Sequence, residues 1–181
     1  SGTSAVLNLN GHKIVNKVLN VPAIKVQGKL ELDGDGTIDG GEGGNNNALC
    51  AMTGGEIIIK GGTYTVGGDA NNNANSCIYN YGGDVIIYDG YFRSECPYIG
   101  NYYVLNLNNS QHGSIVVYGG QFENYDPATG DDNLGGSFLA PGYKTTKIGN
   151  VYIVSKSDVT PVADKAGFDA AITAGPADQP M

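Results

Sequence analysis

Two groups of carboxylates are the residues best suited to acid–base chemistry. Asp131 and Asp132 are adjacent, and four more acids occur in the segment 33–42, namely Asp33, Asp35, Asp39 and Glu42. Glycoside hydrolysis commonly uses two facing carboxyls about 5 to 10 Å apart. Neither group has a suitably placed Arg or Lys in a neighbouring repeat, which a lyase requires to stabilise an enolate. We therefore expect solvated turn residues and predict no catalytic residue.

The same acidic segment resembles a calcium loop only loosely. Its alternating acids stop at Thr37, and no Glu closes a twelve-residue frame.

His12 and His112 are isolated from any nucleophile motif, so we expect surface or turn positions for both histidines. Cys50, Cys77 and Cys96 lack metal-type spacing, which indicates free thiols. No glycine pair leads into a helix as phosphate-binding loops do. The sequence predicts neither a metal site nor a cofactor.

The charge of the chain argues against nucleic acid as a partner, and its short apolar stretches argue against membrane insertion. Its formal net charge is -8, with a pI near 4.5 and only 10 Lys and Arg among 181 residues. Nucleic-acid binding requires a basic face that this composition does not supply. The apolar stretches are far shorter than the roughly 20 residues that cross a bilayer. We expect a protein without nucleic acid or membrane insertion.

A repeated strand positions all of these residues. Similar segments begin at Lys29, Glu56, Asp84 and Ser114, at intervals of 27, 28 and 30 residues, and a fifth copy is predicted at 150–154. Three copies are followed at a fixed distance by a Gly and an aromatic residue: Gly62 and Tyr64, Gly90 and Phe92, Gly120 and Phe122. Such a register is typical of a solenoid.

Each period also contains an earlier strand, which ends at a glycine turn. The four earlier strands lie at 24–28, 50–54, 78–82 and 104–107. One period is therefore strand, turn, strand, turn, short strand and loop. This pattern predicts an all-β, right-handed parallel β-helix of about five to six coils. A β-sandwich is the alternative, but it would show antiparallel hairpin signals without a fixed register.

Side-chain alternation assigns the faces of the repeated strands. We expect three inward stacks: Leu30, Ile57, Val85, Ile115 and Val151; Leu32, Ile59, Ile87, Val117 and Ile153; and Ile38, Tyr64, Phe92 and Phe122. The Asn runs 45–47 and 71–73 are expected to form turns rather than to contact glycans.

The chain is predicted to divide into a β-helix over 1–160 and a capping segment over 161–181. Asp164 to Gly175 has the capping residue, apolar spacing and terminal glycine of a short C-terminal helix. At the other end, 6–12 is already a strand and turn without a cap, so we expect further sequence before Ser1.

The outer face of the repeated strands is apolar where a solvated face would be polar. Six outward residues are predicted to form an interface: Ile58, Ile86, Val116, Tyr152, Tyr88 and Tyr118. Contiguous exposed apolar surface usually marks a contact with another chain. We expect a homo-oligomer, with a trimer favoured. The alternatives are that the C-terminal segment covers this face, or that the tyrosines hold a sugar ring.

The segments 7–14, 36–40 and 61–64 resemble coils of pectate-lyase-like right-handed β-helix proteins. Polygalacturonases of that superfamily share the Gly-Thr-Ile-Asp-Gly segment at 36–40, but their catalytic Asp trio and basic motif have no matching positions here. The lyase calcium and arginine set is missing as well. The segments 138–144, 150–154 and 168–172 resemble β-helical surface and fibre proteins of bacteriophages and gut bacteria.

These resemblances imply a non-catalytic structural or attachment protein. The first hypothesis is a phage virion component, such as a head or tail fibre or a capsid decoration module, at the virion surface or outside the cell. Its expected partners are copies of itself, other virion or surface proteins and a host glycan. The alternatives are a polysaccharide-active enzyme or sugar-binding module, and a bacterial extracellular adhesin. Fold alone does not decide among them.

Overall fold

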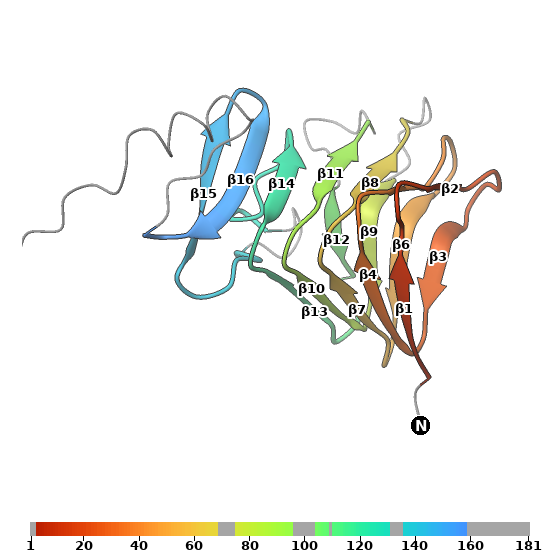
Figure 1. Cartoon of the computed structure of the whole chain (residues 1–181). Helices are drawn as coiled ribbons and strands as arrows, with labels where there is room; N and C mark the ends of the chain where they lie inside the picture. Colours follow the sequence, from red (N-terminus) through yellow and green to blue (C-terminus); the bar gives the residue numbers. More distant parts are fainter. Residues whose placement is uncertain (1–2, 69–74, 96–103, 109, 131–135, 159–181) are drawn as a thin grey trace, which may run out of the picture.

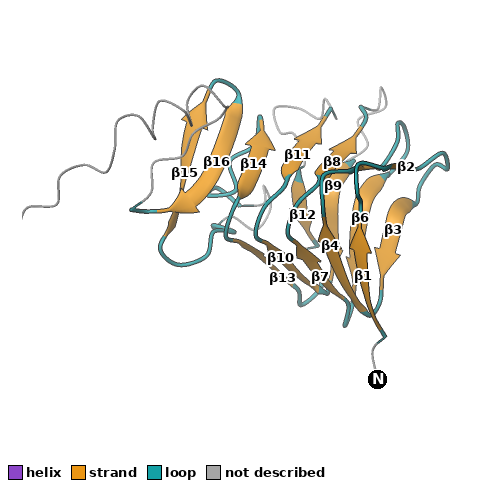
Figure 2. Ribbon diagram, in the orientation of Figure 1, coloured by secondary structure: helices purple, strands orange, loops and turns teal. Residues whose placement is uncertain are grey.

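The protein is a parallel β-solenoid built from three sheets (Figure 1). The structure, a computed structural model, describes residues 3–68, 75–95, 104–108, 110–130 and 136–158. Figure 2 shows only strands and loops in this part of the chain. The described part contains no helical stretch with the length and hydrophobicity of a membrane span.

Each sheet collects one strand from each of the first four coils, and sheets A and B contain further strands. Sheet A consists of β1 (Ser4–Asn8), β4 (Lys29–Asp33), β7 (Glu56–Ile59), β10 (Asp84–Ile87) and β13 (Ser114–Val117). Sheet B contains β2 (Lys13–Val15), β5 (Thr37–Asp39), β8 (Thr63–Val66), β11 (Tyr91–Ser94) and β14 (Gly120–Glu123), followed by β16 (Val151–Lys156) and β15 (Tyr143–Ile148). Sheet C contains β3 (Pro22–Val26), β6 (Asn47–Met52), β9 (Ser76–Tyr81) and β12 (Leu105–Leu107).

The described residues complete about four turns, fewer than the five to six coils that we predicted. β13 and β14 begin a fifth turn, which has no strand in sheet C among the residues described. The predicted helix from Asp164 to Gly175, and the segment 161–181 that contains it, lie outside the described residues.

The inward stacks of the first four repeats are confirmed. Leu30, Ile57, Val85 and Ile115 occupy successive positions of one parallel register. In the neighbouring stack Leu32, Ile59, Ile87 and Val117 are all fully buried. Burying each large apolar side chain stabilises the fold by about 1.5 to 3 kcal/mol. The repeat therefore produces one hydrophobic column along the solenoid.

Sheet B contributes an aromatic stack to this column. Tyr64 lies 5.0 Å from Phe92, and Phe92 lies 4.8 Å from Phe122, with interplanar angles of 13° and 7°. All three side chains are inaccessible to solvent. Parallel pairing of β8, β11 and β14 repeats the same inward position at each coil, which brings the rings face to face.

The prediction that 150–154 forms a fifth copy of the sheet A strand is wrong. These residues form the beginning of β16, which pairs antiparallel with β14 in sheet B and places Tyr152 beside Phe122. β15 and β16 form a hairpin across a two-residue turn, in which Gly149 has a φ of 62°. Closing such a short loop costs little entropy, so the local antiparallel partner replaces the distant parallel one.

The corners of the coils depend on glycine. Gly90, between β10 and β11, has a φ of 130°, a conformation that side chains disfavour. At another corner a Cβ on Gly83 would lie 2.5 Å from the carbonyl oxygen of Gly55 in the preceding coil. Asn80 fixes this corner, because its side chain donates to the oxygens of Gly83 and Ser114 and accepts from the Gly83 amide.

Candidate functional site

A polar groove of about 640 Å³ lies over the outer face of sheet B. Its floor has two columns of outward side chains in parallel register. The first column is Lys13, Thr37 and Thr63, and the second is Val15, Asp39, Thr65 and Arg93. The alternation that sends Ile38 and Tyr64 into the core sends these neighbours outward. The groove therefore crosses four coils, a distance of about 14 Å at the usual strand spacing.

The segments that follow the sheet B strands form the wall of the groove. They contribute Asn16, Lys17 and Leu19 from the first coil, Gly41, Glu42 and Asn46 from the second, Gly67 from the third and Glu95 from the fourth. Successive segments contact one another: the Gly67 amide donates to the Gly41 oxygen at 2.9 Å. The wall thus follows the same stacking as the floor.

Buried asparagines support this wall. The backbone N–H of Asn46 donates to Asn75 Oδ1 at 2.9 Å, and Ser76 Oγ donates to Asn47 Oδ1 at 2.6 Å. Asn46 and Asn47 are therefore structural. The run 45–47 was expected to form a turn, but only Asn45 and Asn46 precede the strand, and Asn47 is the first residue of β6. The second run, 71–73, lies outside the described residues.

Asp39 and Lys13 form an ion pair in the floor, so the expectation that the acidic segment has no basic residue placed beside it in a neighbouring coil is wrong for Asp39. Lys13 Nζ lies 2.9 Å from Asp39 Oδ2, and the Gly41 amide donates to Asp39 Oδ1 at 3.0 Å. Burial raises the pKa of Asp39, but the hydrogen bonds and charge of Lys13, with the Gly41 amide and Thr65, lower it below its usual value. The carboxylate is held ionised and already has partners within the groove.

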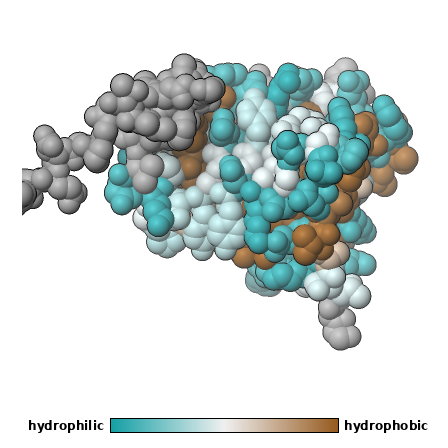
Figure 3. Space-filling model, in the orientation of Figure 1, coloured by the Kyte–Doolittle hydropathy of each residue, from teal (hydrophilic) through white to brown (hydrophobic). Residues whose placement is uncertain are grey.

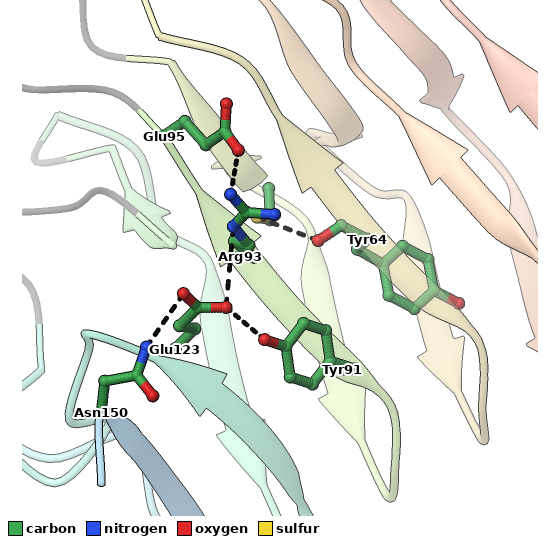
Figure 4. Close-up of polar contacts among 7 residues, drawn as sticks. Tyr64, Tyr91, Arg93, Glu95, Glu123 and Asn150 are labelled. Atoms are coloured by element: carbon green, nitrogen blue, oxygen red, sulfur yellow. Dashed lines mark hydrogen bonds and ion pairs between the residues drawn. The ribbon is translucent and has the colours of Figure 1, made fainter.

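Arg93 connects the far end of the groove to the next coil (Figure 4). It donates to Glu95, and its Nε lies 3.6 Å from Glu123 Oε2. Glu123 also accepts from the Tyr91 hydroxyl and from Asn150 Nδ2, the latter at 3.0 Å. Burial, with the hydrogen bond to Glu123 and its charge, raises the pKa of Tyr91 to about 12. Glu123 is thus fixed by groups from β11 and from the β15–β16 turn.

The structure divides the acids of the segment 33–42, because Asp33 lies on sheet A whereas Asp39 and Glu42 both line the groove. Asp33 ends a strand of sheet A, whereas Asp39 ends a strand of sheet B. Asp39 and Glu123 share a column but lie three strands apart, about 14 Å, which exceeds the separation of hydrolytic carboxyl pairs. Asp131 and Asp132 lie outside the described residues. The part of the chain that is described contains no cluster of three metal-ligating side chains.

Among the described residues, no histidine or cysteine lines the groove. His12 and His112 are exposed, as expected. Cys50 and Cys77 are free thiols, and burial raises the pKa of both. The Cys77 thiol donates to the backbone carbonyl oxygen of Tyr64 at 3.3 Å, a contact drawn in Figure 4. Both thiols are unreactive core groups at neutral pH. Cys96 lies outside the described residues.

Five of the six predicted interface residues lie together on the outer face of sheet A. Ile58, Ile86 and Val116 occupy adjacent positions of β7, β10 and β13 and are half-buried. Tyr88 and Tyr118 follow β10 and β13, with ring centroids 5.1 Å apart. Figure 3 shows brown, apolar side chains among polar ones on the side of the molecule that carries sheet A.

Tyr152 is the exception among the six, because β16 belongs to sheet B. The outward column of sheet A that contains Ile58, Ile86 and Val116 also includes Val6 of β1. Val6 pairs with Glu31 and is 72% exposed. Sequence reasoning missed Val6 because its alignment of the repeats began at Lys29.

The two tyrosines do not form a platform for a sugar. Their planes are 19° apart, so one face of each ring is covered by the other ring. Tyr143 packs edge-on against Tyr118 at 5.4 Å. Stacking on a saccharide requires an accessible ring face, and only Tyr88, 48% exposed, has much free surface. The outer face of sheet A is better suited to packing against protein.

Sequence reasoning missed the groove. The signal was present, because the outward residues of β5 and β8 alternate with the predicted inward stack.

Comparison with protein-family models, with curated proteins and with solved structures finds no match. The solenoid is shown by the structure itself, and the likeness to pectate-lyase-like proteins still rests on the short motifs quoted above.

Proposed function

We propose that this chain is a non-catalytic attachment module that binds an extended saccharide in the groove over sheet B. The observation that carries this proposal is the polar floor, in which each of four coils contributes at least one polar side chain: Lys13, then Thr37 and Asp39, then Thr63 and Thr65, then Arg93. Its volume of about 640 Å³ is within the usual range for small-molecule sites, but such sites are mostly apolar. A polyhydroxylated ligand matches this lining better than an apolar one.

The spacing of the floor also supports an extended saccharide. Successive coils repeat their side chains every 4.8 Å or so, which is comparable to the length of one sugar ring. A chain of three or four sugars would therefore meet at least one polar floor side chain at each coil. Together with the motif resemblances, this suggests a role on a virion surface or elsewhere outside the cell.

Saccharide binding is tested by calorimetric titration with a panel of hexasaccharides. Thr63→Val removes one floor hydroxyl and keeps the side-chain shape, and Thr146→Val is the matched control on β15, outside the groove. One lost hydrogen bond corresponds to a roughly threefold to tenfold weaker Kd. Equal Kd values for the two variants would contradict the assignment of the groove. New reducing ends after incubation would contradict a non-catalytic role.

Assembly through the outer face of sheet A is a second candidate function. It is favoured by the half-buried stripe of Ile58, Ile86 and Val116, flanked by the ion pairs Lys29–Glu56 and Lys60–Glu31. An apolar centre with a charged rim is typical of protein interfaces. The expected assembly is a homotrimer, as in a fibre or capsid decoration protein.

Native mass measurement tests this assembly. The wild-type chain should have the mass of a trimer, and Ile86→Lys should give a monomer because it buries a charge in the stripe. Thr146→Lys adds the same charge on sheet B and should leave the trimer intact. A monomeric wild-type chain would contradict the assembly.

A further inference from the structure

Two of the three cations that line the groove already have anionic partners. Lys13 is paired with Asp39, and Arg93 is paired with Glu95 and Glu123. An acidic ligand would have to break one of these pairs or lie close to their carboxylates. Both outcomes reduce its affinity, because the acidic ligand competes with carboxylates that are already in place or is repelled by them.

The other charged residues of the groove do not give it an excess of positive charge. Lys17 and Glu42 line the groove near its first two coils, and both are exposed. Among the described lining residues there are thus three cations and three anions. Glu123 adds a further carboxylate beside Arg93. The groove therefore has no excess of positive charge, and the whole chain has a net charge of -8.

We propose that the groove selects uncharged saccharides and discriminates against those that carry carboxylates. This inference rests on the proposed saccharide-binding function and narrows it to one chemical class. Neutral hydroxyls can donate to the Asp39 and Glu95 carboxylates and accept from Lys13 and Arg93 without separating either ion pair. A uronic acid brings one negative charge per sugar into a groove in which both floor cations are already paired. The third cation, Lys17, lies on the wall, where the carboxylate of Glu42 offsets its charge.

The experiment compares ligands of equal length and different charge. Calorimetric titrations at about 20 mM salt would use neutral hexasaccharides of glucose, galactose and N-acetylglucosamine, and hexamers of galacturonic and guluronic acid. We expect at least one neutral hexamer to bind, with every uronate hexamer at least tenfold weaker. Added salt should reduce this difference, because it screens the repulsion.

Two variants test whether the ion pairs cause the selectivity. Asp39→Asn leaves Lys13 without its partner, and Glu95→Gln leaves Arg93 with Glu123 alone; Glu95 is exposed, so its loss should not affect folding. Each should strengthen uronate binding at least threefold. Glu56→Gln is the matched control, because it makes the same change in net charge in an ion pair on sheet A.

The outcomes separate the inference from the function on which it rests. Uronates that bind the wild-type chain as tightly as neutral hexamers would overturn the inference and leave saccharide binding intact. The same applies if Glu56→Gln strengthens uronate binding as much as Asp39→Asn and Glu95→Gln do. If no hexamer of either class binds, the proposed function fails, and this inference fails with it.

Discussion

Truncation of Phe92 should be among the most destabilising single changes in this protein. The side chain has no solvent exposure and is stacked on both faces, against Tyr64 at 5.0 Å and Phe122 at 4.8 Å. Phe→Ala changes in cores typically reduce the free energy of unfolding by 3 to 5 kcal/mol. Because the neighbouring coils hold the two flanking rings apart, the cavity cannot close easily. We expect a loss of about 4 kcal/mol for Phe92→Ala.

Two further variants separate ring stacking from cavity formation. Phe92→Leu keeps most of the volume and removes two aromatic pairs, each worth about 0.5 to 1.5 kcal/mol, so it should lose about 1 to 3 kcal/mol. Tyr88→Ala also removes a stacked ring, but from an exposed position with one stacking partner. Its loss should stay below about 1.5 kcal/mol.

Guanidinium denaturation followed by far-ultraviolet circular dichroism measures all three variants, with linear extrapolation to water. The expected order of destabilisation is Phe92→Ala, then Phe92→Leu, then Tyr88→Ala. If Phe92→Ala loses no more stability than Tyr88→Ala, the aromatic column is not a main source of stability, and the reasoning from the stacks is refuted.

Three other perturbations test separate parts of the structure. Asn80→Ala leaves the Gly83 amide and the Ser114 oxygen without partners at a buried corner, so it should lose about 2 to 4 kcal/mol in the same denaturation assay; a loss below that of Tyr88→Ala would contradict the corner role of Asn80. Gly83→Ala should lower the melting temperature by several degrees or prevent folding, because its Cβ would lie 2.5 Å from the Gly55 oxygen of the preceding coil; an unchanged melting temperature would show that these coils can separate. The pKa of Tyr91 is raised to about 12 from an ordinary value of 10.0, so its contribution to stability is complete below pH 10 and is lost as the pH rises towards 12. Tyr91→Phe should therefore flatten the decline of stability over that range, and an unchanged decline would show that another group causes it.

The core could be predicted from the sequence because a parallel solenoid repeats each position in the next coil. Residues such as Ile57 and Val85 appear in the chain at the interval at which they stack in space. The alternation of apolar and polar residues then fixes which side faces inward. The partner of a single strand cannot be read in this way. The strand β16 has the same alternation as β13, and the Gly149–Asn150 turn, a common hairpin signal, decides its partner.

The groove was predictable in part. Its floor follows from the alternation in β5 and β8, where Thr37, Asp39, Thr63 and Thr65 lie opposite inward residues. Its wall was not, because the segments after these strands have different lengths and compositions. The contact of Gly67 with the Glu42 side chain, for example, depends on the path of two unrelated loops. Periodicity predicts the regular strands, but loop paths depend on contacts between coils.

The antiparallel hairpin at the end of sheet B has a consequence for solubility. A parallel sheet that ends in an open strand is a template on which another polypeptide can polymerise. Here β16 runs antiparallel to β14 and β15 runs antiparallel to β16, so the parallel pairing ends at β14, and the outermost described strand, β15, carries Lys144 and Lys147. Charged side chains on a terminal strand discourage edge-to-edge aggregation, since a second copy would bring lysine against lysine. The two lysines of the hairpin therefore oppose the addition of a further strand at this end of the described sheet B.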